Sequence, residues 1–320
     1  CSLPRLMAQI SRPLRLTFYI LVILAGTVLS AGLAMRHAER QTLVEEAARA
    51  NEQLGLYANS LHTLIERYRA LPAVLALDPE LRAALQGPVA TETQDALNRK
   101  LEKINGAARS STLELLNHDG LAVAASNWRL PSSYVGHNYG FRPYFKQTRS
   151  QGSGRFYAVG VTSGIPGYFL ASAVKADNQD FLGAMVVKLE FPELEHEWSQ
   201  GNDTLLVSDA RGIVFIANQP GWRYRHLQPL SSNDLEEIKL TRQYDKQPLT
   251  PLQHQTLQRF DDNSSLARVE GPEGRASYLW ESLPLAAEGW TLHLLRKPPN
   301  AFEETRNAGL AAAGAWLTLV

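Results

Sequence analysis

Two long apolar runs without charge frame the sequence. The first, residues 17–35 (TFYILVILAGTVLSAGLAM), is long enough to cross the hydrocarbon core of a bilayer as a helix. Three arginines precede it, and the first acidic residue of the chain, Glu39, follows it. The positive-inside rule therefore predicts that residues 1–16 are cytoplasmic and that the chain after residue 35 is exported. A cleaved signal peptide is the alternative, but the apolar run continues into a helical pattern.

The second apolar run is residues 307–320 (NAGLAAAGAWLTLV), directly after Arg306. It is too short to span about 30 Å at about 1.5 Å per residue. We expect it to be a truncated second transmembrane helix. Residues 36–300 would then lie in the periplasm, between two anchors in the bacterial inner membrane.

A helical pattern follows the first apolar run. Apolar residues recur at spacings of three, four and seven, which predicts one long helix over 36–71. This helix either packs only on its own domain or also pairs across a homodimer, and the pattern leaves both open. The apolar positions are Leu43, Ala47, Leu54, Tyr57, Leu61, Leu64, Ile65, Tyr68 and Leu71.

Beyond the long helix, short helices give way to strands. Asp78-Pro79-Glu80 is typical of a helix start, and Thr91 to Ala108 predicts a further helix. Two strand–turn–strand patterns follow, at 113–127 and 205–218. Their turn glycines, Gly120 and Gly212, are 92 positions apart, and aligning them superposes both apolar runs. The chain is therefore predicted to be α+β, with related modules at 72–195 and 200–297; residues 231–265 fit one helix plus loops.

Composition excludes several functions. Lys+Arg and Asp+Glu are both 32, and this balance argues against nucleic-acid binding. The single cysteine, Cys1, excludes an internal disulfide framework and a CxxC site. The eight histidines lack metal-ligand spacing, and the common catalytic motifs are absent. We therefore expect neither a catalytic nor a metal site in these 320 residues.

The densest polar cluster lies in residues 137–190, in the runs HNYGFRPYF, RFYAVGVTSGIPGYFLASAV and GAMVVKLEF. Arg142 can bind a carboxylate through two parallel hydrogen bonds, and Lys188, inside an apolar strand, can meet a second carboxylate. Neutral donors and glycines that permit close approach complete a candidate site for an anion with two carboxylates: Tyr139, Thr162, Ser163, Gly164 and Gly167. The alternative is ordinary structure: an ion pair, a turn and core aromatics.

The same runs, NYGFRPYF, TSGIPGYFLASAV and VVKLEF, resemble the periplasmic sensor region of C4-dicarboxylate-sensing histidine kinases of the DctB type. The layout of anchor, long helix, two modules and second anchor is also similar. The resemblance implies a double-Cache sensor, with PAS-like modules and ligand bound in the membrane-distal one, 72–195. It leaves open whether Tyr168 or Phe169 faces the ligand. The ligand-binding residues it implies are Tyr139, Arg142, Tyr144, Thr162, Ser163, Gly164, Tyr168, Phe169 and Lys188.

The resemblance further implies signalling without chemistry in this chain. Succinate, malate or fumarate would shift a two-state equilibrium that passes to the second membrane helix. A cytoplasmic kinase region, using ATP and Mg²⁺, would autophosphorylate on histidine and pass phosphate to a response regulator for dicarboxylate uptake. A dicarboxylate transporter is an additional candidate partner. None of the kinase motifs is present here, and no cofactor is expected in this chain.

Other functions remain open at this point. The output could be that of a chemoreceptor or a cyclase. The ligand could be 2-oxoglutarate, because one extra methylene discriminates weakly. An amino acid would need a carboxylate for its ammonium group; Asp177 and Asp180 are the nearest in sequence, and Lys188 argues against it. A structural membrane protein without a ligand is the last alternative.

Overall fold

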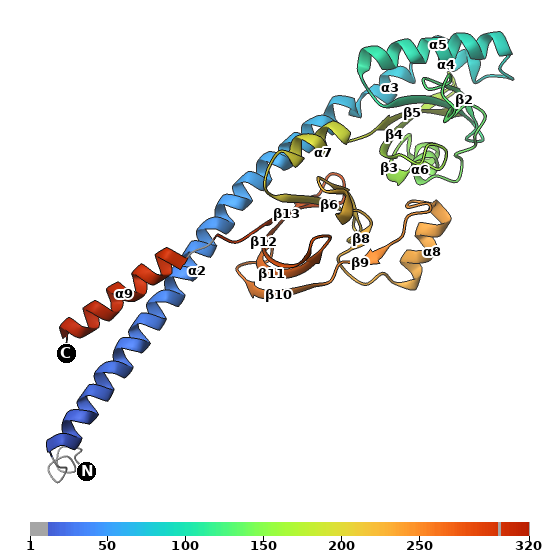
Figure 1. Cartoon of the computed structure of the whole chain (residues 1–320). Helices are drawn as coiled ribbons and strands as arrows, with labels where there is room; N and C mark the ends of the chain where they lie inside the picture. The colour runs from blue at the N-terminus through green and yellow to red at the C-terminus, as the bar shows by residue number, and fades with distance from the viewer. Residues whose placement is uncertain (1–11, 300–301, 320) are drawn as a thin grey trace.

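The computed structural model describes residues 12–299 and 302–319, and its longest helix, α2 (Arg12–Arg69), runs from the N-terminal end past the proximal strands to the start of the distal module (Figure 1). The membrane segment and the long helix predicted from the sequence therefore form one helix without a break. Most of the predicted cytoplasmic segment, including Cys1, lies outside the described residues.

The two parts of α2 have different environments. Apolar side chains near its N-terminus, such as Val28 and Leu29, are exposed, as expected of a surface that faces lipid. Leu54, Leu61 and Ile65, at spacings of seven and four, are buried in the core shared with the modules. The same helix thus combines a membrane-length segment with an amphipathic support for the modules.

The C-terminal helix, α9 (Phe302–Leu319), lies beside the apolar part of α2 (Figure 1). Small residues allow the approach: a side chain at Gly26 would collide with the indole of Trp316. Trp316 also donates a hydrogen bond to the carbonyl of Ile23, at 3.2 Å. Within residues 12–299 and 302–319, one helix is long and apolar enough to cross a membrane, near the N-terminus. The second span stays a prediction, and its last residue lies outside the described residues.

The distal module is an antiparallel sheet of order β2-β1-β5-β4-β3, covered on both faces. The helices α3, α4 and α5 pack on one face, and α6 packs on the other. Asp78 caps α4 as the sequence predicted, because its side chain accepts from the backbone of Glu80 and Leu81. The elements are α3 (Leu71–Leu75), α4 (Pro79–Ala84), α5 (Thr91–Ala108), β1 (Thr112–Asn117), β2 (Ala122–Ala125), α6 (Pro143–Gln151), β3 (Ser153–Val159), β4 (Pro166–Lys175) and β5 (Phe181–Leu189).

The proximal module follows after α7 and has a sheet of order β10-β11-β12-β13-β6-β7, together with a parallel β8-β9 pair. The segment 231–265 contains the predicted helix, but it also forms strands. The side chains of β10 are mostly exposed, so no alternation marked that strand. The elements are α7 (Pro192–Ser199), β6 (Thr204–Ser208), β7 (Val214–Ala217), η2 (Pro220–Trp222), β8 (Arg225–His226), α8 (Ser232–Thr241), β9 (Thr250–Pro251), β10 (His254–Arg259), β11 (Ser264–Gly271), β12 (Gly274–Leu285) and β13 (Trp290–Arg296).

The two sheets repeat one topology. In each, the first hairpin forms an edge, and the last strand of the module returns to pair with the first strand. The side chain of Ser126 accepts from the backbone N–H of Leu113 at 2.9 Å, and that of Asn218 accepts from Leu205 at the same distance. These pairs match under the 92-residue alignment. The predicted α+β class with tandem PAS-like modules on a long helix is confirmed.

The modules pack directly on each other. The rings of Tyr157 and Phe215 lie 4.0 Å apart, and the ring of Trp290 meets both. The backbone N–H of Val159, at the end of β3, donates to the carbonyl of Gln243, just after α8, at 2.8 Å. The C-terminal end of α8 is therefore attached to the edge of the distal sheet.

Candidate functional site

Charged side chains are buried on the face of the distal sheet that α6 covers. Glu114 on β1 and Lys188 on β5 are each 1% exposed. Both interrupt apolar strands, and both alternate with residues of the opposite core. In the sheet, Lys188 lies opposite Phe169 of β4, which faces the same side. Burying ionisable groups is costly unless they are paired, so this face is a candidate site.

The start of α6 positions two further residues. Arg142 is extended at the N-cap, and Pro143 at the first helical position fixes the backbone there. Tyr144 is then buried one residue later, where its ring stacks on Phe169 at 5.1 Å. Its hydroxyl donates to Oε1 of Glu114, at 3.3 Å. The R-P-Y-F motif thus places an arginine and a tyrosine on the buried face of the sheet.

Arg142 connects the two modules. Its Nη2 donates to the carbonyl of Val159 at 2.7 Å, and its Nη1 donates to the carbonyls of Thr241 and Arg242, each at 3.0 Å. The last two carbonyls belong to the C-terminal end of α8, where a cation is favourable. Burial lowers the pKa of Arg142, but a guanidinium remains charged. Its Nε is buried and has no hydrogen-bond partner among the described residues.

Lys188 is held beneath a tight loop. Its Nζ donates to the carbonyl of Ile165 at 3.0 Å and to Oε1 of Glu190 at 2.5 Å. A side chain at Gly167 would collide with Cε of Lys188, so this glycine is required for the close approach. Gly164 has a φ of +70° and closes the loop through a hydrogen bond from its N–H to the carbonyl of Gly160. The lysine is therefore buried yet partnered.

Neutral hydroxyls surround the cations. The hydroxyls of Tyr139 and Thr162 lie 2.7 Å apart, and those of Tyr134 and Ser163 lie 3.3 Å apart. The rings of the two tyrosines meet edge to face at 5.8 Å. Burial raises the pKa of Tyr139, and it raises that of Tyr134 despite the nearby charge of Lys188. Both phenols therefore remain neutral donors.

Two residues of the cluster were missed from the sequence. Tyr134 lies in a polar loop with no recognisable pattern. Glu114 could have been found, since it interrupts the apolar run LELL as Lys188 interrupts VVKL. Burial raises the pKa of Glu114 to about 7, against the lowering effects of Tyr144, Lys188 and Arg142. Its Oε2 has no partner within the described part of the chain.

The structure brings together most of the predicted residues: Tyr139, Arg142, Tyr144, Thr162, Ser163, Gly164, Phe169 and Lys188. Tyr168 does not join them. Because side chains alternate along β4, it points to the opposite face, where its hydroxyl donates to Glu288 and its ring packs on Trp290. Of the two neighbouring aromatic residues, Phe169 faces the cluster.

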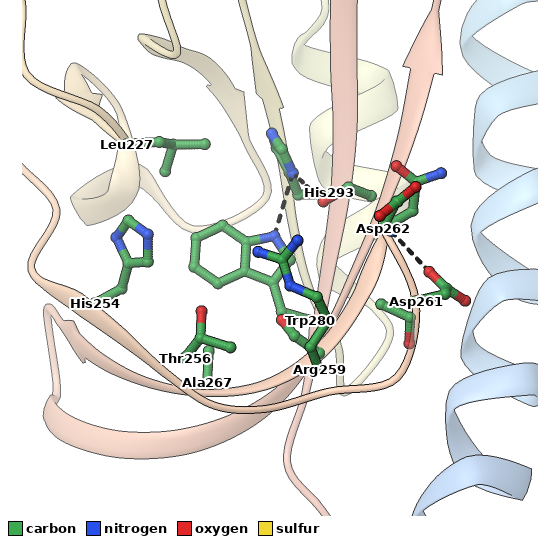
Figure 2. A pocket seen from close by; sticks show the side chains of 13 residues that line it. Leu227, His254, Thr256, Arg259, Asp261, Asp262, Ala267, Trp280 and His293 are labelled. Atoms are coloured by element: carbon green, nitrogen blue, oxygen red, sulfur yellow. Dashed lines mark hydrogen bonds between the residues drawn. The ribbon is translucent and has the colours of Figure 1, made fainter.

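The proximal module contains a hollow of about 180 Å³, lined by Trp280, His293 and residues of the β10–β11 turn (Figure 2). Nδ1 of His293 accepts from Nε1 of Trp280 at 3.2 Å, and its Nε2 lies 2.9 Å from the hydroxyl of Ser208. Burial lowers the pKa of His293 to about 3, so the ring is neutral. The described residues contain no group of three or more His, Cys, Asp or Glu that could hold a metal. The buried histidine is thus a satisfied core group.

The fold and the cluster together define a class: a double-Cache sensor domain carried on a membrane-length helix. No family model matches the chain. It is 34% identical to the C4-dicarboxylate transport sensor protein DctB of Rhizobium meliloti, over 88% of this chain and 45% of the relative. It is 30% identical to the protein of the same name from Pseudomonas aeruginosa, over 98% of this chain and 49% of the relative.

The crystal structure of the V. cholerae histidine kinase DctB sensor domain superposes with a TM-score of 0.72 at 27% identity, covering 80% of this chain and 98% of that one. The chain spans about half the length of the curated relatives it matches. It is a homologue of the C4-dicarboxylate transport sensor proteins and has the fold of a DctB sensor domain, which confirms the resemblance seen in the motifs.

Proposed function

We propose that the distal module binds a C4-dicarboxylate between Arg142 and Lys188. The observation that carries this proposal is the buried Nε–H of Arg142, which no group among the described residues accepts. Such a donor is costly to leave unpaired, and a carboxylate is its strongest partner. Lys188, buried on the same side of the sheet, supplies the charge for a second carboxylate.

The surrounding groups suit the rest of such a ligand. The stacked rings of Tyr144 and Phe169 offer an apolar contact for the carbon chain. The hydroxyls of Tyr139, Thr162 and Ser163 would complete the hydrogen bonds of the carboxylates. Succinate, malate and fumarate fit two cations of this kind. The names of the curated relatives also support a C4-dicarboxylate.

Two other classes of ligand could bind at the same site, and the titration below includes both. The five-carbon 2-oxoglutarate is close, because one methylene changes pocket affinity by only about 1–3 kcal/mol. An amino acid is favoured by one observation, the buried carboxyl of Glu114, which could meet an ammonium group. Asp177 is a poor candidate for that role, since its side chain is 95% exposed and paired with Arg82.

Arg142 also provides a route for the signal. Its Nη1 binds the last carbonyls of α8, while its Nε would bind the ligand. A carboxylate that binds and displaces the guanidinium would change the position of α8 relative to the edge of the distal sheet. A ligand shifts an equilibrium only through different affinities for its two states, and this contact can differ between them. The proximal module, α2 and α9 would pass the change to the membrane.

In the whole protein, this region would control a sensor histidine kinase in the inner membrane, with residues 36–300 in the periplasm. The kinase region, with its ATP and Mg²⁺, would be a further part of the same protein, and the cognate response regulator would be a separate partner. A homodimer and a functional link to a dicarboxylate transporter complete the proposal. The names of the curated relatives support a link to dicarboxylate transport.

The test is calorimetric titration of the detergent-solubilised chain with succinate, malate, fumarate, 2-oxoglutarate and L-alanine, an amino acid with a single carboxylate, with acetate as the control. We expect saturable binding of a dicarboxylate and none of acetate, because acetate can occupy only one of the two cations. Binding of the amino acid without any dicarboxylate would overturn the proposal.

A further inference from the structure

The buried carboxyl of Glu114 has no assigned role in the proposed site. It lies on β1, opposite Val186 of β5 and Ala125 of β2, so its strand neighbours offer no polar group. Oε1 accepts one hydrogen bond, from Tyr144, while Oε2 accepts none among the described residues. An ionised carboxylate can accept about four hydrogen bonds, so its charged form is poorly solvated here.

The nearby charges do not neutralise Glu114 directly. From β5 it faces Lys188, whose Nζ is already paired with Glu190. From the start of α6 it faces Arg142, whose terminal nitrogens bind three carbonyls. The remaining titratable groups that face it are the phenols of Tyr144, Tyr139 and Tyr134. Within the described residues, Glu114 has no ion pair.

We propose that Glu114 takes up a proton from solvent when a dicarboxylate binds between Arg142 and Lys188, so that dicarboxylate binding is coupled to pH. This inference rests on the proposed function. With Glu114 and Glu190 ionised, the cluster holds two positive and two negative charges. A dianion added beside a buried carboxylate raises the carboxyl pKa further, because like charges at short range oppose ionisation.

Protonation also creates a useful donor. The proton on Oε2 turns an unpaired acceptor into an O–H group, which can donate to a ligand carboxylate. Burial already brings the pKa of free Glu114 to about 7. Affinity should therefore be constant at pH values where Glu114 of the ligand-free protein is already protonated, and it should fall as pH rises above about 7. The expected slope there is about tenfold per pH unit, for one proton taken up.

Fumarate is the suitable probe, because both of its carboxyls are ionised throughout the range used. The full chain is titrated from about pH 6 to about pH 8.5, and at about pH 8 in two buffers of different ionisation enthalpy, phosphate and Tris. The difference in observed heat gives the protons taken up per ligand. We expect about one proton per bound fumarate at about pH 8.

The Glu114→Gln variant mimics the protonated carboxyl, since it keeps an acceptor for Tyr144 and adds a donor. It should bind fumarate without proton uptake and without the slope above about pH 7. The matched control is Glu190→Gln, which removes the other carboxyl of the cluster and should retain the uptake. If Glu114→Gln fails to fold, the wild type and Glu190→Gln still decide the question.

The outcomes separate the two proposals. Fumarate binding without proton uptake, or uptake that Glu190→Gln abolishes, overturns the role of Glu114 and leaves the dicarboxylate site standing. Absence of binding by fumarate, succinate and malate overturns the site and the proton coupling with it. Binding of L-alanine alone, with no proton uptake, would assign Glu114 to an ammonium group instead.

Discussion

The two modules share a topology but differ in how they treat buried polar groups. In the proximal module, the buried polar atoms that line the hollow near His293 have partners. In the distal module, the corresponding core contains Nε of Arg142 and Oε2 of Glu114, which lack partners among the described residues. Native structures rarely leave such groups unpaired. Nε of Arg223 in the proximal module also lacks a partner among the described residues, but it lies outside the hollow and its guanidinium is paired with Glu195. The difference is that an unpaired buried donor and an unpaired buried acceptor belong to one cluster in the distal module, and this feature, rather than the size of a hollow, marks the ligand module.

The contact between the modules sharpens this comparison. Arg142 belongs to the distal module but binds carbonyls at the end of α8 in the proximal one. The side chain expected to bind a ligand is thus also a structural link. The proximal module can therefore respond to the ligand without a site of its own.

The largest expected effect is that of Arg142→Ala on ligand affinity. Removing one partner of a buried charge pair costs about 2–5 kcal/mol, so dicarboxylate binding should weaken at least tenfold. Calorimetry with succinate measures it, and Arg149→Ala, an exposed arginine on the same helix, is the matched control. A loss of less than about threefold would show that Arg142 does not contact the ligand.

His293→Gln should act on stability and not on affinity. Burial lowers the pKa of His293 in the folded protein from its ordinary value of 6.5 to about 3. Below about pH 6.5 this histidine is therefore protonated in the unfolded chain but not in the folded one. The wild type should therefore lose stability as pH falls from about 6.5, by up to about 1.4 kcal/mol per pH unit.

Denaturant unfolding of wild type and variant at several pH values measures this effect. Glu114 and Glu281, whose pKa values are raised to about 7, give stability that is lost as pH rises, so only the difference between the two proteins isolates His293. Equal pH profiles would contradict a buried neutral histidine. A changed succinate affinity in the folded variant would contradict the assignment of the ligand site to the distal module alone.

Gly167→Ala should give an intermediate effect in the distal module. Its Cβ would lie 2.5 Å from Cε of Lys188 and 2.8 Å from the carbonyl oxygen of Leu189. Overpacking of this kind costs about 1–3 kcal/mol, and it should also displace the lysine from the ligand. Chemical denaturation and succinate titration measure both effects. Gly87→Ala, where a Cβ meets nothing within 4 Å, is the control; equal behaviour of the two variants would sink the prediction.

The smallest effect is expected for Tyr168→Phe. Its hydroxyl binds Glu288 on the face away from the cluster, so dicarboxylate affinity should change by less than about twofold. The same titration measures it, with Tyr139→Phe as the matched change on the other face. A large loss for Tyr168→Phe would mean that the ligand binds at the junction with the proximal module.

Patterns local in the sequence predicted most of the fold. Alternation and turn glycines located both hairpins, and the repeat between Gly120 and Gly212 predicted the shared topology. Strand β10 was not predicted, because its side chains are mostly exposed and show no alternation. The alternation of side chains along β4 shows that Tyr168 and Phe169 point to opposite faces of the sheet, but it does not show which of them points to the site. Only the structure places Phe169 on the side of the cluster.

The candidate site was predictable where a motif concentrates its residues. Arg142 and Lys188 stood out as charges in apolar or aromatic surroundings. The carbonyls that Arg142 binds come from Thr241 and Arg242, a hundred positions away, and no local pattern encodes such a contact. Glu114 carried the same signal as Lys188, an ionisable residue in an apolar strand, and it belongs to the cluster for the same physical reason.

The most direct test of the difference between the modules is a crystal structure of the chain bound to succinate. We expect one carboxylate of succinate on Nε of Arg142 and the other on Nζ of Lys188, with the carbon chain against Phe169. Succinate in the proximal hollow beside Trp280 and His293, with Nε of Arg142 still unpaired, would contradict the assignment.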